Sequence, residues 1–167
     1  MSQIPPHKNL LTYRYAEIVF DLTDGFVKKF LPEIDNRRTR EQMVQAARSG
    51  KQNIVEGTSR SKTSKKSEIT LLDVSRASLE ELIADYEDFL RQRKLQIWVK
   101  DDPRVQKMRQ TGFRLSNLRN LSDLGNLIER PKLPENPIIA ANFLLTLCHQ
   151  ATFLLSRQIA SVEKEII

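Results

Sequence analysis

The chain has 167 residues, among them 27 Lys and Arg, 21 Asp and Glu, and a single cysteine. This length fits one domain over residues 1–167 with its own hydrophobic core. One cysteine excludes an internal disulfide and favours a reducing, cytoplasmic setting. The formal net charge of +6 suggests an anionic partner, although a modest positive excess is also an ordinary route to solubility.

Glycine is scarce, at 5 residues, and long segments rich in Leu, Ala, Glu, Lys and Arg predict helices. The expected fold class is all-α: an up-down four-helix bundle with an irregular, partly helical insertion before the last helix. The helices are expected at about residues 10–31, 39–56, 65–95 and 136–165, and the irregular part at residues 98–135.

In the first predicted helix apolar residues recur every three or four positions, and Pro32 follows its end. Thr39 is expected to cap the second helix and Gly57 to stop it. Gly50 lies on a face of small residues within this second helix. Because glycine costs about 1 kcal/mol of helix propensity relative to alanine, we expect Gly50 to mark a close approach of another helix.

The third helix is expected to begin after Ser64, with apolar residues in a near-heptad pattern. Arg76 interrupts this pattern, and a charge at such a position is usually paired or lies at the edge of the apolar stripe. Asp102 followed by Pro103 is typical of a helix start, which predicts a short helix to about Arg109. The segment LRNLSDLGNLIER, residues 118–130, suggests a further turn or two.

Asn136 and Pro137 form the same kind of start for the last helix. This helix is apolar nearly all round, whereas a bundle helix needs only one apolar face. Polar residues divide its apolar run, which falls short of the roughly 20 residues of a membrane span, so no membrane partner is expected. The surplus apolar surface predicts a homo-oligomer whose subunits meet along this helix. The expected interface residues are Phe143, Leu144, Leu147, Phe153 and Leu154.

Charge alternates in blocks along the chain. Residues 37–66 hold nine Lys or Arg against two Asp or Glu, residues 67–90 hold one against seven, and residues 91–119 hold nine against two. Few aromatic residues lie among these cations, which favours contact with nucleic-acid phosphates over the reading of bases. The candidate nucleic-acid-binding residues are Arg48, Lys51, Arg60, Lys62, Lys65, Lys66, Arg91, Arg93 and Lys94.

No constellation of residues indicates catalysis. His7 and His149 are far apart in sequence, and no Asp, Glu or His spacing resembles a metal site. The chain has no phosphate-binding glycine loop, dinucleotide fingerprint or nucleophile elbow. Cys148 and His149 lie among apolar residues, so we expect Cys148 to be buried and His149 to be buried or interfacial. The prediction is a protein that is not an enzyme and that has no cofactor and no metal.

Three segments resemble a known family: REQMVQAARSGKQNIVEGTSR, SKKSEITLLDVSRASLEELIADYEDFL and AANFLLTLCHQATFLLSRQI. They resemble the four-helix bundle proteins grouped with those encoded in bacterial ribosomal RNA intervening sequences. The accessory variability determinant of diversity-generating retroelements is similar to that group. The resemblance implies an up-down four-helix bundle that assembles into a ring or barrel of five subunits with a basic surface. In the retroelement branch it further implies binding to nucleic acid and to a reverse transcriptase.

The sequence leaves two functions open. In the first, a homo-oligomer, expected to be a pentamer, binds RNA or DNA through phosphates contacted by the basic blocks. In the second, the bundle is a protein–protein interaction scaffold without nucleic-acid binding. Its basic blocks then meet acidic protein surfaces, including the segment from Glu80 to Asp88 on an adjacent subunit.

Overall fold

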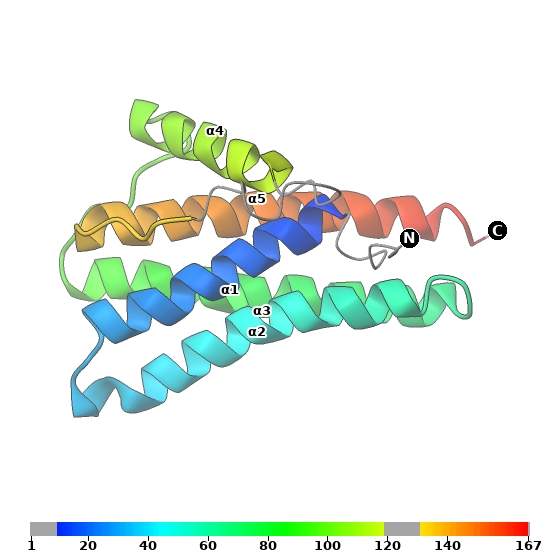
Figure 1. Ribbon diagram of the computed structural model, residues 1–167, viewed down its shortest axis with the longest axis horizontal. Helices are drawn as coiled ribbons and strands as arrows, with labels where there is room; N and C mark the ends of the chain where they lie inside the picture. The colour runs from blue at the N-terminus through cyan, green and yellow to red at the C-terminus, as the bar shows by residue number, and fades with distance from the viewer. Residues whose placement is uncertain (1–9, 119–130, 167) are drawn as a thin grey trace.

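A computed structural model describes residues 10–118 and 131–166. This part of the chain folds into five α helices and contains no strand, so the predicted all-α class is confirmed (Figure 1). The helices are α1 (Leu11–Phe30), α2 (Arg37–Ser59), α3 (Lys65–Gln92), α4 (Pro103–Leu118) and α5 (Pro137–Glu163). A single 3₁₀ turn, Ile34–Asn36, precedes α2.

The four long helices pack in a closed order, and α4 lies across the outside of α5 (Figure 1). Both α1 and α3 pack on α2 and on α5, and α4 packs on α5 and α1. In the core, the ring centroid of Phe26 lies 4.9 Å from those of Tyr86 and Phe89. The Tyr86 hydroxyl shares a 2.8 Å hydrogen bond with Thr23. These contacts join α1 to α3 through the centre of the molecule.

Two buried glycines of α2 face α3. A Cβ atom on Gly50 would lie 2.8 Å from Leu79 Cδ2, and the Ser75 hydroxyl donates a hydrogen bond to the Gly50 carbonyl. The prediction that Gly50 marks a close helix approach is therefore confirmed. The prediction that Gly57 ends the helix is wrong, since α2 continues to Ser59. Gly57 is a second packing position, where a Cβ would lie 3.4 Å from the Glu68 carbonyl oxygen.

Three helix starts follow from local capping, as the sequence predicts. Ser64 accepts a hydrogen bond from the Ser67 N–H at 3.1 Å at the start of α3. Asp102 accepts one from the Arg104 N–H at 2.9 Å at the start of α4. The Asn136 side chain accepts two, from the first-turn N–H groups of α5. Each cap satisfies donors that a helix cannot satisfy internally.

The predicted N-cap at Thr39 is wrong, because α2 begins two residues earlier, at Arg37. Asn36 occupies the capping position without a side-chain hydrogen bond. Instead, a side chain within the helix stabilises the start of α2. Arg40 donates hydrogen bonds of 2.6 Å to the carbonyls of Leu31 and Glu33, which precede the helix. This guanidinium ties the beginning of α2 to the end of α1.

The region expected to be irregular contains α4, which continues past Arg109 to Leu118. Its register on α5 is set by Gly112, where a Cβ atom would lie 2.8 Å from Leu147 Cδ2. Asn142 of α5 holds the connection before α4, since it accepts a hydrogen bond from the Trp98 N–H and donates one to the Gln96 carbonyl. Most of the further turns predicted at residues 118–130 lie outside the described residues, as does His7.

Among the described helices, α5 is long and apolar enough to cross a membrane by length and composition alone. Core helices of folded proteins share this property, and 67% of its most apolar 18-residue window is buried within the protein. Three helices cover it, because α1, α3 and α4 all pack on it. Most of its apolar residues therefore have burial partners within the chain, whereas Ile139 and Phe153 are exposed.

Arg76, the charge that interrupts the apolar pattern of α3, is paired as predicted. Its guanidinium forms an ion pair with Asp73 and donates a 3.2 Å hydrogen bond to the Ser156 hydroxyl of α5. The side chain thus lies at the edge of the contact between α3 and α5. Its role in the structure is to bridge these two helices.

Candidate nucleic-acid interface

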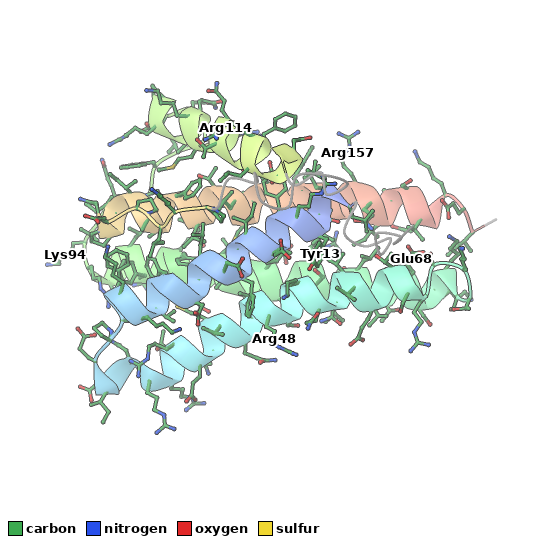
Figure 2. All side chains as sticks on the ribbon, viewed as in Figure 1. Tyr13, Arg48, Glu68, Lys94, Arg114 and Arg157 are labelled. Carbon is green, nitrogen blue, oxygen red and sulfur yellow. The ribbon has the colours of Figure 1, made fainter. Side chains whose placement is uncertain are left out.

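The nine predicted cationic residues do not form one surface. Four lie where α2 turns into α3, and we call them the turn cluster: Arg60, Lys62, Lys65 and Lys66. Three lie at the other end of α3: Arg91, Arg93 and Lys94. Since α3 has 28 residues, about 42 Å at 1.5 Å per residue, the two groups are far apart. Figure 2 labels Glu68, next to the turn cluster, and Lys94 at opposite ends of the molecule.

In the turn cluster, Arg60, Lys62 and Lys66 are exposed. Lys65 and Lys66 belong to the first turn of α3, at the positive end of the helix dipole. Cations are unfavourable at this position, so the helix dipole does not explain them. An anion at the same place would be attracted both by the lysines and by the helix N-terminus.

Lys65 has two carboxylate partners. Its Nζ lies 2.8 Å from Glu165, just beyond α5, and 3.7 Å from Glu68, one turn further along α3. The hydrogen bond to Glu165 raises the pKa of the Lys65 ammonium group. Lys65 thus links the end of α5 to the start of α3. The other three members of the turn cluster form no ion pair within the described residues.

The cations at the far end of α3 have local structural roles. Arg91 forms a 3.1 Å ion pair with Asp88. The Arg93 guanidinium lies 4.0 Å from the Phe89 ring centroid and donates a hydrogen bond to the Phe89 carbonyl. Lys94 adopts a left-handed conformation, with φ of 57°, directly after the helix. Cations at a helix C-terminus complement its dipole, so these residues need no anionic partner to explain them.

Arg48 and Lys51 lie midway along α2, apart from both groups. Arg48 is exposed and is labelled on the outer side of α2 in Figure 2. Lys51 is half-buried, with its Nζ 4.6 Å from the centroid of the Phe20 ring. A cation over an aromatic face is a stabilising contact within the protein. Of this pair, only Arg48 presents its charge to the solvent.

Three of the five predicted interface residues are buried within their own chain. These residues, Phe143, Leu144 and Leu147, are buried because α1, α3 and α4 surround α5. Leu154 is half-buried, and Phe153 remains 60% exposed. Of the five predicted residues, Phe153 is thus the one whose side chain is mainly open to a partner.

Sequence reasoning missed an exposed aromatic residue on α4. Phe113 is 59% exposed and lines the same surface groove as Phe153. A signal for it was present, because Val105, Met108, Gly112 and Leu115 follow helical spacing through this segment. That pattern predicts a helix extending beyond Arg109, with Phe113 next to its packed face.

Within residues 10–118 and 131–166, no group of three or more His, Cys, Asp or Glu is placed to hold a metal ion. Cys148 is buried as predicted, and burial raises the pKa of its thiol far above the usual range, which makes a thiolate nucleophile unfavourable. His149 is exposed, so it is not buried within its own chain, and the alternative that it lies at an interface stays a prediction.

Comparison with known proteins finds no match to a family model, to a curated protein or to a solved structure. The resemblance to the intervening-sequence proteins therefore stays a prediction made from the three quoted segments.

Proposed function

We propose that this protein binds RNA or DNA through its phosphates, without catalysing a reaction, and that the turn cluster is the contact site. The observation that carries this proposal is the position of Lys66, which is exposed and forms no ion pair within the described residues, in the first turn of α3. Cations there weaken the helix, whereas together with the helix N-terminus they attract phosphate. Arg60 and Lys62 extend the same exposed cationic surface.

The resemblance supports a finer description of the assembly. We infer that α1, α2, α3 and α5 act as an up-down four-helix bundle, with α4 added to its outside, in a cytoplasmic protein. A ring of five copies would repeat the turn cluster around its rim, and such repetition strengthens phosphate binding by multivalency. A reverse transcriptase is the protein partner that the retroelement branch of the resemblance implies.

The test is a titration of fluorescein-labelled single-stranded RNA and DNA, followed by fluorescence anisotropy at ~50 and ~200 mM salt. The variant is Lys62→Glu with Lys66→Glu, which leaves the ion pairs of Lys65 intact. The matched control is Lys94→Glu with Lys107→Glu, two exposed lysines away from the turn cluster. Both double variants change the net charge equally.

We expect the Lys62 and Lys66 variant to bind at least tenfold more weakly at low salt, with the salt-dependence slope reduced by about 2. The control is expected to bind like the wild type. Absence of binding by the folded wild-type protein at low salt would overturn the proposal. Equal losses in both variants would assign binding to net charge and not to the turn cluster.

The second candidate is a protein-interaction scaffold. It is favoured by exposed acids on α3, since Glu80, Glu81 and Glu87 have no ion-pair partner within the described residues. If these acids meet the turn cluster of another copy, the Lys62 and Lys66 variant changes the sedimentation coefficient. If the turn cluster binds nucleic acid, the same variant keeps the wild-type assembly and loses only nucleic-acid binding.

A further inference from the structure

A surface groove runs along α5 between α3 and α4. Both of these helices pack on α5, and within the described chain they do not pack on each other, which leaves a strip of α5 uncovered between them. The groove has a volume of about 700 Å³, and its α5 lining extends from Asn142 to Ser156. The segment with Trp98 lines it as well. At 1.5 Å per residue, the span of α5 from Asn142 to Ser156 corresponds to about four helical turns.

Two aromatic side chains in the groove are mainly exposed. Phe113 of α4 is 59% exposed and Phe153 of α5 is 60% exposed. Val105 and Leu115 of α4 are buried, so α4 buries other apolar residues and leaves Phe113 in the groove. Exposed aromatic side chains in a concave site are typical anchors of a protein interface.

The groove has opposite charges on its two sides. Glu80 and Glu87 line it from α3, whereas Arg109 lines it from α4 and Lys100 from the connection before α4. Within the described residues none of these four side chains has an ion-pair partner. An occupant that complements both sides needs basic residues along one edge, acidic residues along the other and an apolar stripe between them.

A single helix fits this description better than a second copy of the chain. Two copies of a concave surface cannot fill each other. The outer surface of α2, which is convex, presents polar side chains such as Gln42, Gln45 and Arg48, and these would leave Phe113 and Phe153 without apolar contacts. An amphipathic helix has the required convex apolar face.

We propose that this groove binds an amphipathic α-helix from another protein. Its apolar stripe packs on Phe113 and Phe153, its Lys or Arg edge faces α3, and its Asp or Glu edge faces α4. This interaction is separate from the turn cluster, so each proposal can fail without the other.

The probe is a synthetic helical peptide of ~15 residues, about four turns, with a Leu stripe, Lys along one edge and Glu along the other. The control peptide has the same composition and the same Leu stripe, but Lys and Glu alternate along both edges. If the probe binds in the opposite direction along the groove, its Lys and Glu edges exchange sides, so one of the two directions matches the charges of the groove. The control peptide has mixed charges on both edges in either direction. Binding is measured by anisotropy of a fluorescent label on each peptide.

We expect the probe to bind about tenfold more tightly than the control peptide. Phe113→Ala and Phe153→Ala are each expected to weaken probe binding by about tenfold. Both side chains are mainly exposed, so circular dichroism should stay unchanged. Ile34→Ala is the matched protein control, because Ile34 is exposed outside the groove.

Three results would overturn the proposal. The first is no binding of the probe, and the second is equal binding of probe and control peptides. The third is self-association of the wild type that is lost in the Phe113→Ala and Phe153→Ala variants, which would identify a second copy as the occupant.

Discussion

Glu68 is a carboxylate in an unfavourable place near the start of α3. Its side chain is 8% exposed, and Oε1 has no hydrogen-bond partner in the described part of the chain. Lys65 Nζ is 3.7 Å away, which is within ion-pair range but too long for a hydrogen bond. Burial is the main cause that raises the pKa of Glu68, and the attraction of Lys65 offsets it only in part.

This raised pKa predicts how stability changes with pH. The folded chain holds the Glu68 proton more tightly than the unfolded chain, so the stability gained from protonation is lost as pH rises through the folded pKa. We therefore expect Glu68→Gln to be more stable than the wild type at pH ~7 and similar to it near pH ~4. Urea unfolding at both pH values measures this difference.

The matched control for Glu68 is Glu56→Gln, an exposed glutamate on α2. This variant is expected to have the stability of the wild type at both pH values. If Glu68→Gln were less stable than the wild type at pH ~7, attraction to Lys65 would outweigh the burial of the carboxylate.

Among the elements, local signals predicted the starts of α3, α4 and α5 but neither the start of α2 nor the length of α4. The caps at Ser64, Asp102 and Asn136 involve residues next to each other in sequence, so they could be recognised there. The extension of α4 depends on tertiary packing, because Gly112 fits against Leu147 of a helix far away in the sequence. Glycine weakens a helix in isolation, and only the contact with α5 explains why α4 continues through it.

A side chain at position 112 should therefore loosen α4. In Gly112→Val the added atoms meet Leu147 Cδ2, 2.8 Å from the Cβ position, and Gln150 Oε1, 2.6 Å from it. We expect a loss of about 1–3 kcal/mol from overpacking. Hydrogen exchange followed by mass spectrometry should show faster exchange in α4 and in the middle of α5.

Gln110→Val is the control for this experiment, since Gln110 is an exposed position on the same helix. Valine raises helix propensity where it replaces glycine at position 112 and lowers it slightly where it replaces glutamine at position 110. Propensity alone would therefore favour the helix in Gly112→Val, so faster exchange in Gly112→Val than in Gln110→Val reports the packing of α4 on α5. Unchanged exchange of α4 in Gly112→Val would show that α4 does not depend on this contact.

At the scale of the whole molecule, the sequence predicted that α5 is apolar on nearly every side but not which helices pack on it. The apolar character of α5 on every side was readable from the sequence, yet α4 accounts for part of its burial and was expected to be short. The candidate site shows the same limit. The nine cations were identified as residues, and the predicted helix at about residues 65–95 already separated Lys65 from Arg91. The contacts of Lys51 with Phe20 and of Lys65 with Glu165, which are far apart in the sequence, follow only from the fold.

A substitution of Leu147 tests whether this residue lies in the core of one chain or at a subunit interface. Because Leu147 is completely buried within one chain, Leu147→Ala should cost about 2–5 kcal/mol of folding stability. We expect the same decrease in melting temperature at low and high protein concentration, measured by thermal unfolding. Sedimentation velocity should show the same assembly state as the wild type.

Phe153→Ala provides the comparison for Leu147, because its side chain is 60% exposed. Its effect on folding stability is expected to be small. A melting temperature that depends on protein concentration for Leu147→Ala alone would instead place this residue between subunits.

The burial of α5 on several sides also bears on how the protein is made. Three helices that pack on it, α1, α3 and α4, precede it in the chain. On the ribosome they emerge before the segment that covers their apolar faces, and exposed apolar surface makes nascent chains prone to aggregation. We therefore expect a nascent chain stalled before Pro137 to be a chaperone client, and release from the chaperone to follow the emergence of the last helical turns.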